Sequence, residues 1–184
     1  MTDGRIQTVY KGRVVTLNLE TVTLPNGISV ELEVVRHPGA AAIVPLKDDH
    51  TVILIRQYRL AAGGYIYEIP AGKLHPGEDP LHCATRELEE EIGYRAEHLN
   101  KIATFFTAPG FTDEVMHLYV ARNLMPGAQA LDSDEVLEIV ELSLEKAMAY
   151  ILDGTIRDAK TIIGLQSIYL HRTESQTSID HSPA

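Results

Sequence analysis

The sequence predicts a single α/β domain with a mixed β-sheet, preceded by an antiparallel β extension. Two observations support this fold class. Segments with the period-two pattern of strands alternate with segments of helical period from about residue 40 onward, whereas residues 5–37 show the strand pattern alone. The 184 residues, of which 45% are hydrophobic and 23% charged, suffice for one domain with a sizeable core.

The N-terminal extension is expected over residues 1–39. Apolar and polar residues alternate in it from 5 to 37, with Val, Ile, Thr and Tyr prominent, as is typical of strands. The run Pro25-Asn26-Gly27 predicts a hairpin turn. Strands that lie outside a core must bury one face elsewhere, so a second copy of the chain is a candidate to cover part of this face.

The main domain is expected over residues 40–171. Its strands are predicted from short apolar or alternating runs and its helices from apolar residues at helical spacing. The predicted strands are 40–46, 51–60, 65–69, 101–106, 115–121 and 136–142. The predicted helices are 80–92, 143–154 and 158–171, and the predicted loops include 71–79, 107–113 and 123–134. The polar tail, 172–184, is expected to be disordered.

The helix predicted over 80–92 has clear end signals. Asp79 is a typical N-cap residue before Pro80, and Gly93 is a typical helix stop. The residues at helical spacing that we expect to be buried are Leu81, Ala84, Leu88 and Ile92.

Charge and cysteine content limit the partners and the compartment. A net charge of -10 argues against duplex nucleic acid or an anionic membrane as the main partner, although a bound metal ion can still bring in a phosphorylated small molecule. The one cysteine, Cys83, cannot form an internal disulfide, which fits a reducing compartment. The chain also lacks the apolar core of a signal peptide and a run of about 18 apolar residues, so we expect a cytoplasmic protein.

Four carboxylates, those of Glu87, Glu89, Glu90 and Glu91, lie just before Gly93. The helix dipole is already negative at this end, and like charges three or four residues apart repel, so this placement requires a positive charge nearby. Glu87, Glu90 and Glu91 share one helical face, and hard cations such as Mg2+ or Mn2+ suit their oxygens. A solvated acidic surface is the alternative, but the unfavourable helix end and the Gly/Pro loop before the helix favour a metal site.

The stretch from Gly72 to Tyr94 resembles the complete signature of the Nudix hydrolases. Gly72, Glu78 and the run from Arg86 to Gly93 occupy its fixed positions, and Tyr94 departs from it at a position that is normally aliphatic. The resemblance implies an α/β/α sandwich and metal-dependent hydrolysis of a nucleoside diphosphate linked to another group. It also implies that Arg86 orients the carboxylates. The metal ligands that it implies are the carbonyl of Ala71 and the side chains of Glu87, Glu90 and Glu91.

Features outside this signature are similar to the ADP-ribose pyrophosphatase branch of the family. They are Pro109, which lies 16 residues after Gly93, the runs 56–59 and 68–72, and the N-terminal strands. This similarity implies Mg2+-dependent hydrolysis of ADP-ribose to AMP and ribose 5-phosphate, with Mn2+ as the other candidate metal. It also implies a homodimer that exchanges its N-terminal strands, so that the adenine site uses residues of both subunits.

The candidate substrate-binding residues are Arg56, Glu68, Tyr10 and Pro109. Arg56, near a strand end, is either a bidentate phosphate donor or a surface charge. For Glu68 three roles stay open: binding a ribose hydroxyl, binding a metal-bound water, or pairing with Arg56. Tyr10 and Tyr58 are candidates to stack on a base, although packing is the commoner role of such side chains.

The candidate catalytic residues are Glu135, Arg86 and Glu90. Hydrolysis needs a base that activates water, and the related branch takes this base, or another metal ligand, from an acidic loop before a late strand. The usual glutamate aligns on or beside Ser133 here, so Glu135 is the nearest candidate and Glu138 the next. A carboxylate of the signature is the alternative base, and Glu135 would then be dispensable.

Two other kinds of function stay open at the level of sequence. The same chemistry would serve GDP-mannose, another sugar nucleotide or a dinucleoside polyphosphate, because the contacts that discriminate these substrates lie in loops and across the dimer. A non-catalytic nucleotide sensor belongs to a different class, and the complete set of signature acids argues against it.

Overall fold

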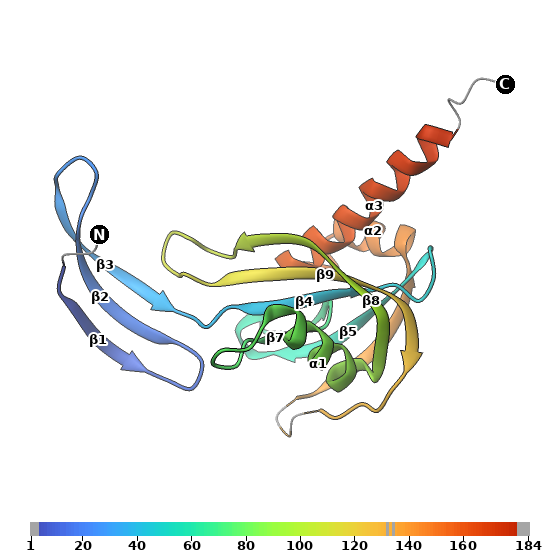
Figure 1. The fold of residues 1–184 in the computed structure, drawn as a ribbon, viewed down its shortest axis with the longest axis horizontal. Helices are drawn as coiled ribbons and strands as arrows, with labels where there is room; N and C mark the ends of the chain where they lie inside the picture. Colours follow the sequence, from blue (N-terminus) through green and yellow to red (C-terminus); the bar gives the residue numbers. More distant parts are fainter. Residues whose placement is uncertain (1–3, 132, 134, 180–184) are drawn as a thin grey trace.

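The computed structural model describes residues 4–131, 133 and 135–179, with side chains described as far as Arg172. Within these residues, three α-helices pack on β-sheets, as Figure 1 shows. The strands are β1 (Ile6–Lys11), β2 (Thr16–Thr23), β3 (Ser29–Arg36), β4 (Ala40–Pro45), β5 (Thr51–Arg59), β6 (Gly64–Glu68), β7 (Ala71–Lys73), β8 (Tyr94–Phe106), β9 (Val115–Pro126) and β10 (Leu137–Ser143). The helices are α1 (Pro80–Ile92), α2 (Leu144–Leu152) and α3 (Ala159–Ile179), with a short 3-10 turn at Leu60–Ala62.

The main domain is an α/β/α sandwich, as predicted, with α1 on one side of the sheets and α2 and α3 on the other (Figure 1). One sheet has the order β7-β4-β9-β8, in which only β4 and β9 are parallel, and the second has the antiparallel order β10-β5-β6. Alternation along β4 explains the two layers, since Ala42 and Val44 pack toward α2 and α3 whereas Ala41 and Ile43 pack toward α1.

Helix α1 begins and ends at the predicted residues. The Asp79 side chain accepts a hydrogen bond from the Leu81 N–H at 2.8 Å, and Gly93 adopts a left-handed φ of 69° that suits glycine. The predicted burial of Leu81 is wrong, because this residue lies in the first turn, outside the core cluster, and is 40% exposed. Cys83 is buried near that end of the helix instead.

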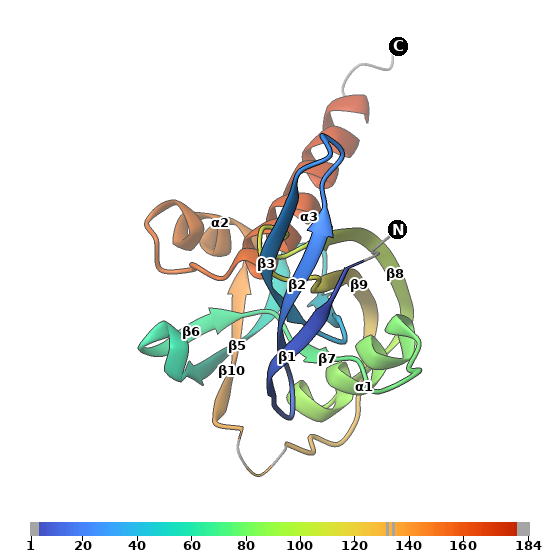
Figure 2. The same cartoon turned by 90° about the vertical axis from the view of Figure 1, so that its left-hand side faces the viewer.

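The N-terminal strands form a separate antiparallel sheet, β1-β2-β3, beside the main domain (Figure 1 and Figure 2). The predicted turn is present, because Gly27 has a φ of 84° and its N–H donates to the Leu24 carbonyl at 2.8 Å. All six residues of β1 are exposed, including Ile6, Val9 and Tyr10. Apolar side chains on this edge strand are therefore open to a partner.

The loop that contains Pro109 ties this sheet to the main domain. The Val35 N–H donates to the Phe111 carbonyl at 2.7 Å, and Asp113 accepts hydrogen bonds from the Arg36 side chain at 3.0 Å and the His37 N–H at 2.8 Å. These bonds fix the direction in which β3 leaves the N-terminal sheet and enters the body of the protein.

The predictions for three strands need correction. Strands β8 and β9 pair from Tyr94 opposite Pro126 to Phe106 opposite Val115, so both are longer than predicted and part of the loop predicted at 123–134 is strand. Their distal ends are largely exposed and polar, and they therefore lack the apolar pattern of a core strand. Residues Ala71–Lys73, predicted as loop, form β7 because they pair with the edge of β4.

The last helix is also longer than predicted. Helix α3 continues to Ile179, so the backbone of 172–179 is helical where disorder was expected, while 180–184 lie outside the described residues. No glycine or proline interrupts the chain from Leu165 to Ile179, and hence no local signal ends the helix earlier. None of the described helices is long and apolar enough to cross a membrane.

Candidate active site

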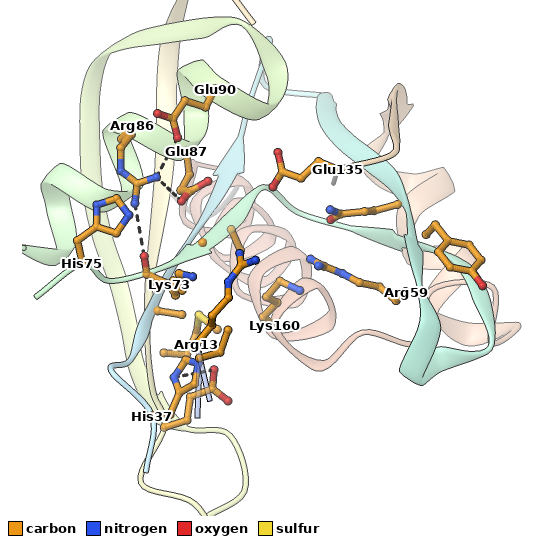
Figure 3. Close-up of a pocket in the computed structure, with 18 of the residues that line it drawn as sticks. Arg13, His37, Arg59, Lys73, His75, Arg86, Glu87, Glu90, Glu135 and Lys160 are labelled. Atoms are coloured by element: carbon orange, nitrogen blue, oxygen red, sulfur yellow. Dashed lines mark hydrogen bonds and ion pairs between the residues drawn. The ribbon is translucent and has the colours of Figure 1, made fainter. Parts of the chain in front are cut away.

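A cavity of about 470 Å³ lies where α1, β7, the end of β5 and the turn after β1 meet (Figure 3). Both carboxylates and cations line it. Arg86, Glu87 and Glu90 project from α1 on one side, and Arg59 and Lys160 point inward from the other (Figure 3). This combination of carboxylates and cations suits a ligand that brings both phosphate groups and a metal ion.

Arg86 is the centre of the acidic side. Its Nη1 donates to Glu87 Oε1 at 2.6 Å and to Glu90 Oε2 at 2.8 Å, and its Nε donates to Glu78 Oε1 at 3.1 Å. The ion pair with Arg86 lowers the pKa of Glu78 to about 2. Burial alone would lower the pKa of Arg86, but its carboxylate partners raise it. Arg86 thus supplies part of the positive charge that the helix end requires.

The two most buried carboxylates of α1 are not fully compensated by positive charge. Glu87 and Glu91 are 8% and 1% exposed, and Glu91 accepts a hydrogen bond from the Ala71 N–H at 2.9 Å. Burial, together with the charge of Glu87, raises the pKa of Glu91 to about 8, and burial raises the pKa of Glu87 as well. A cation at this place would stabilise both carboxylates in their charged form.

The chemistry of these donors fits a hard divalent cation, because carboxylate oxygens and a backbone carbonyl are its usual protein ligands. Within the described part of the chain, however, no three acidic, histidine or cysteine side chains already converge on one point. Arg86 explains this, since its Nη1 holds Glu87 and Glu90. Arg86 engages Oε1 of Glu87 and Oε2 of Glu90, so the second oxygen of each carboxylate stays the candidate ligand atom. The predicted ligand set stays a prediction.

Gly72 makes room for Glu87. A Cβ atom at Gly72 would overlap the carboxylate of Glu87. We expect Gly72→Ala to displace Glu87 and to lower kcat roughly tenfold, because small misplacements of active-site groups have large effects on rate. Steady-state kinetics and the melting temperature of the variant would check this. Wild-type kcat would show that the position of Glu87 does not matter for turnover.

Arg56 does not line the cavity, whereas Arg59 does. The last three residues of β5, Gln57, Tyr58 and Arg59, all line the cavity, so it meets the end of the strand beyond Arg56. Arg56 instead binds Glu138 at 3.3 Å and lies 4.4 Å from the ring centre of Tyr65. The strand was readable in the sequence, but which of its residues would meet the cavity was not.

Glu68 lies behind the cavity wall and is 2% exposed. Of its three open roles, the structure shows ion pairing, but the partners are Arg59 and Lys160 rather than Arg56. Arg59 Nε and Nη2 donate to the two carboxylate oxygens at 2.8 and 3.0 Å, and Lys160 Nζ donates at 2.6 Å. Burial alone would raise the pKa of Glu68, but these two cations lower it.

The structure distinguishes the two candidate bases, Glu135 and Glu138, by their positions relative to the cavity. Glu135 lines the cavity and projects toward its centre (Figure 3), and its charge contributes to the raised pKa values of Glu87 and Glu91, after burial. Glu138 pairs with Arg56, away from the cavity. Of the two loop candidates, the structure therefore brings only Glu135 to the acids of α1.

The remaining predicted binding residues lie elsewhere. Tyr10 is 60% exposed on β1, and Pro109 belongs to the loop beside β3; neither is among the described residues that line the cavity. Arg13, in the turn after β1, does line it (Figure 3), although no sequence pattern singles it out. The N-terminal sheet thus reaches the cavity of its own chain through a turn rather than through Tyr10.

Comparison with known proteins identifies the class. The family model described as NUDIX domain matches residues 35–163, and the chain therefore belongs to the NUDIX family. The resemblance of the stretch from Gly72 to Tyr94 is thereby confirmed.

Individual relatives narrow the class. The chain is 44% identical to the methanol dehydrogenase activator of Bacillus methanolicus, over 90% of this chain and 91% of that protein. It is 42% identical to the ADP-ribose pyrophosphatase of Bacillus subtilis (strain 168), over 88% and 89% of the two chains. A crystal structure of an ADP compounds hydrolase superposes with a TM-score of 0.80 at 28% identity and covers 93% of each chain. The likeness to the ADP-ribose pyrophosphatase branch thus extends over nearly the whole chain.

Proposed function

We propose that the protein hydrolyses the pyrophosphate bond of ADP-ribose to AMP and ribose 5-phosphate, with Mg2+ or Mn2+ as its metal. One observation carries the proposal: two carboxylates of α1, Glu87 and Glu90, line the same cavity as the cations Arg13, Arg59 and Lys160, and Glu91 is buried beside them on the same helix. The cations suit the phosphates and the carboxylates suit the metal. The similarity to the ADP-ribose pyrophosphatase of Bacillus subtilis favours ADP-ribose over other nucleoside diphosphate derivatives as the substrate.

The metal would be held by Glu87, Glu90, Glu91 and the Ala71 carbonyl. When bound, it would neutralise negative charge on the diphosphate and make the attacking water easier to deprotonate. Arg86 orients Glu87 and Glu90 through its hydrogen bonds. Arg59 binds phosphate oxygens from the opposite side of the cavity.

Glu135, which lines the cavity, would take the proton of the attacking water. A new bond forms between the water oxygen and one phosphorus, and the bond from that phosphorus to the bridging oxygen breaks. Each product then carries one phosphate.

A panel of diphosphates tests the substrate. We expect kcat/KM with Mg2+ to be at least about tenfold higher for ADP-ribose than for GDP-mannose, another sugar nucleotide or a dinucleoside polyphosphate, a difference of the size that specific polar contacts provide. A clear preference for GDP-mannose would replace ADP-ribose in the proposal. Failure to hydrolyse any member of the panel would instead favour a non-catalytic nucleotide sensor.

Glu135→Gln tests the base. We expect a fall in kcat of about a hundredfold, the usual contribution of a general base. Glu138→Gln is the matched control, because it makes the same change in the same region but outside the cavity, where Glu138 is 65% exposed at its side chain. Equal activity of the two variants would move the base to a carboxylate of α1.

We also propose a homodimer. The exposed β1 with Ile6, Val9 and Tyr10 supports it, because a second copy can cover this apolar surface. Light scattering after size exclusion should give twice the mass of 20.3 kDa. A monomer at micromolar concentration would contradict this part of the proposal.

The similarity to a methanol dehydrogenase activator favours a second candidate function, the activation of a dehydrogenase. A methanol dehydrogenase assay with wild-type protein and with Glu91→Gln would separate the two. Activation by both proteins would indicate a role that does not depend on hydrolysis. Activation by the wild type alone would link it to the proposed chemistry.

A further inference from the structure

Lys160 reaches the cavity from the opposite layer of the sandwich. It belongs to the first turn of α3, which lies across the sheets from α1 (Figure 1), yet its side chain points into the cavity (Figure 3). This turn is anchored, since Thr161 Oγ1 accepts a hydrogen bond from the Ile69 N–H at 2.8 Å and donates one to Asp158 Oδ2 at 2.6 Å. The position of Lys160 is thus set by fixed neighbours.

Lys160 is part of a chain of four charges. Its Nζ lies 2.6 Å from Glu68 Oε2 and 3.1 Å from Asp158 Oδ1, and Glu68 also binds Arg59. The four charges sum to zero, but only the cations Arg59 and Lys160 line the cavity. The negative partners lie behind them, so the wall presents positive charge to a ligand.

The hydrogen-bonding capacity of Arg59 and Lys160 also favours binding of an anionic ligand. Two of the three Lys160 N–H groups have a carboxylate within reach, which leaves the third for a ligand. Arg59 uses Nε and Nη2 for Glu68, so its Nη1 is the nitrogen that Glu68 does not engage. Lys160 also shares the charge of Glu68, so that Glu68 neutralises Arg59 less completely.

We propose that Lys160 is a phosphate-binding residue, which together with Arg59 holds one phosphate of the substrate on the side of the cavity away from α1. The inference rests on the proposed function in one respect, namely that the substrate carries a diphosphate. It adds that this contact forms without a metal ion, because it is made by protein cations alone.

Calorimetric titration with inorganic pyrophosphate in the presence of EDTA tests the proposal. We expect Lys160→Met to bind pyrophosphate about tenfold more weakly than the wild type, the effect of losing one charge-assisted hydrogen bond. Lys160→Arg should restore binding to within about threefold, because it keeps the charge. Lys146→Met is the control, with the same charge change on α2, where Lys146 lies over the Tyr150 ring.

A second background separates direct binding from an effect through Glu68. In Glu68→Gln, which removes the buried charge, Lys160→Met should still weaken pyrophosphate binding about tenfold if Lys160 touches the phosphate. This pair also stays informative if Lys160→Met alone fails to fold, because no buried carboxylate is then left without its second partner.

The outcomes that would overturn the proposal are specific. They are wild-type protein that binds no pyrophosphate in EDTA, Lys160→Met that binds it as tightly as the wild type, or an effect of Lys160→Met that vanishes in the Glu68→Gln background. The titration involves neither ADP-ribose nor turnover. A failure here therefore leaves the proposed reaction standing, and a failure of ADP-ribose hydrolysis leaves this test standing.

Discussion

Glu91→Gln should abolish turnover while leaving the fold intact. Glutamine keeps the shape of Glu91 and can still accept the hydrogen bond from the Ala71 N–H, so the packing around this 1% exposed side chain should survive. What it removes is the buried charge that would hold a metal ion. We expect kcat to fall by about a thousandfold or more, since charge stabilisation of this kind is a large part of catalysis. Glu90→Gln should behave similarly.

The control for this experiment lies on the same helix. Glu89→Gln makes an identical change one or two residues away, but Glu89 is paired with the exposed Arg95, at 2.8 Å, and is not part of the Arg86 cluster. It should therefore keep near wild-type kcat. Binding of Mn2+, followed by electron paramagnetic resonance, should weaken in Glu91→Gln and not in Glu89→Gln. Near wild-type activity in either Glu90→Gln or Glu91→Gln would remove the metal-site assignment.

Arg86→Gln should lower both activity and stability. Arg86 is shared by Glu78, Glu87 and Glu90, so its loss leaves three carboxylates without their common partner. We expect kcat to fall about a hundredfold, because Glu87 and Glu90 lose their orientation. We also expect the free energy of unfolding to fall by about 3 kcal/mol, the usual consequence of removing one partner from a largely buried ion pair. Arg86→Lys should not rescue activity, since an ammonium cannot replace the planar fork.

Two measurements make the Arg86 result specific. Mg2+ should raise the melting temperature of Arg86→Gln more than that of the wild type, because the ion replaces part of the missing charge and binds only the folded state. Arg95→Gln is the control, since Arg95 pairs with Glu89 on the exposed surface. An Arg86→Gln variant with the activity and melting temperature of the wild type would show that the acids of α1 need no organising partner.

The parts of the fold that sequence predicted well are those with strong local signals. Helix α1 is framed by Asp79 and Gly93, whose capping roles follow from short-range geometry. The apolar run that became β4 is buried on both faces, as its composition indicates. The distal parts of β8 and β9 were missed because their few apolar residues are only partly buried and stand among exposed polar ones, and pairing between strands leaves little trace in either strand alone.

The residues of the candidate site also differ in whether a local sequence signal predicts them. The acids of α1 were found because their spacing of three and four residues places them on one face. Arg56 was selected instead of Arg59 because both arginines lie near the end of one predicted strand. The sequence does not show which of them reaches the cavity. Lys160 and Arg13 reach the cavity from a distant helix and a turn, so only the assembled fold brings them there.

Product analysis with ADP-ribose tests the central claim most directly. The wild-type protein should convert ADP-ribose and Mg2+ to AMP and ribose 5-phosphate in equal amounts, one of each per molecule consumed, as chromatography or phosphorus NMR would measure. The same reaction in EDTA should give neither product, because the carboxylates of α1 would have no metal to hold. Intact ADP-ribose after incubation with Mg2+, or equal yields with and without EDTA, would contradict the account.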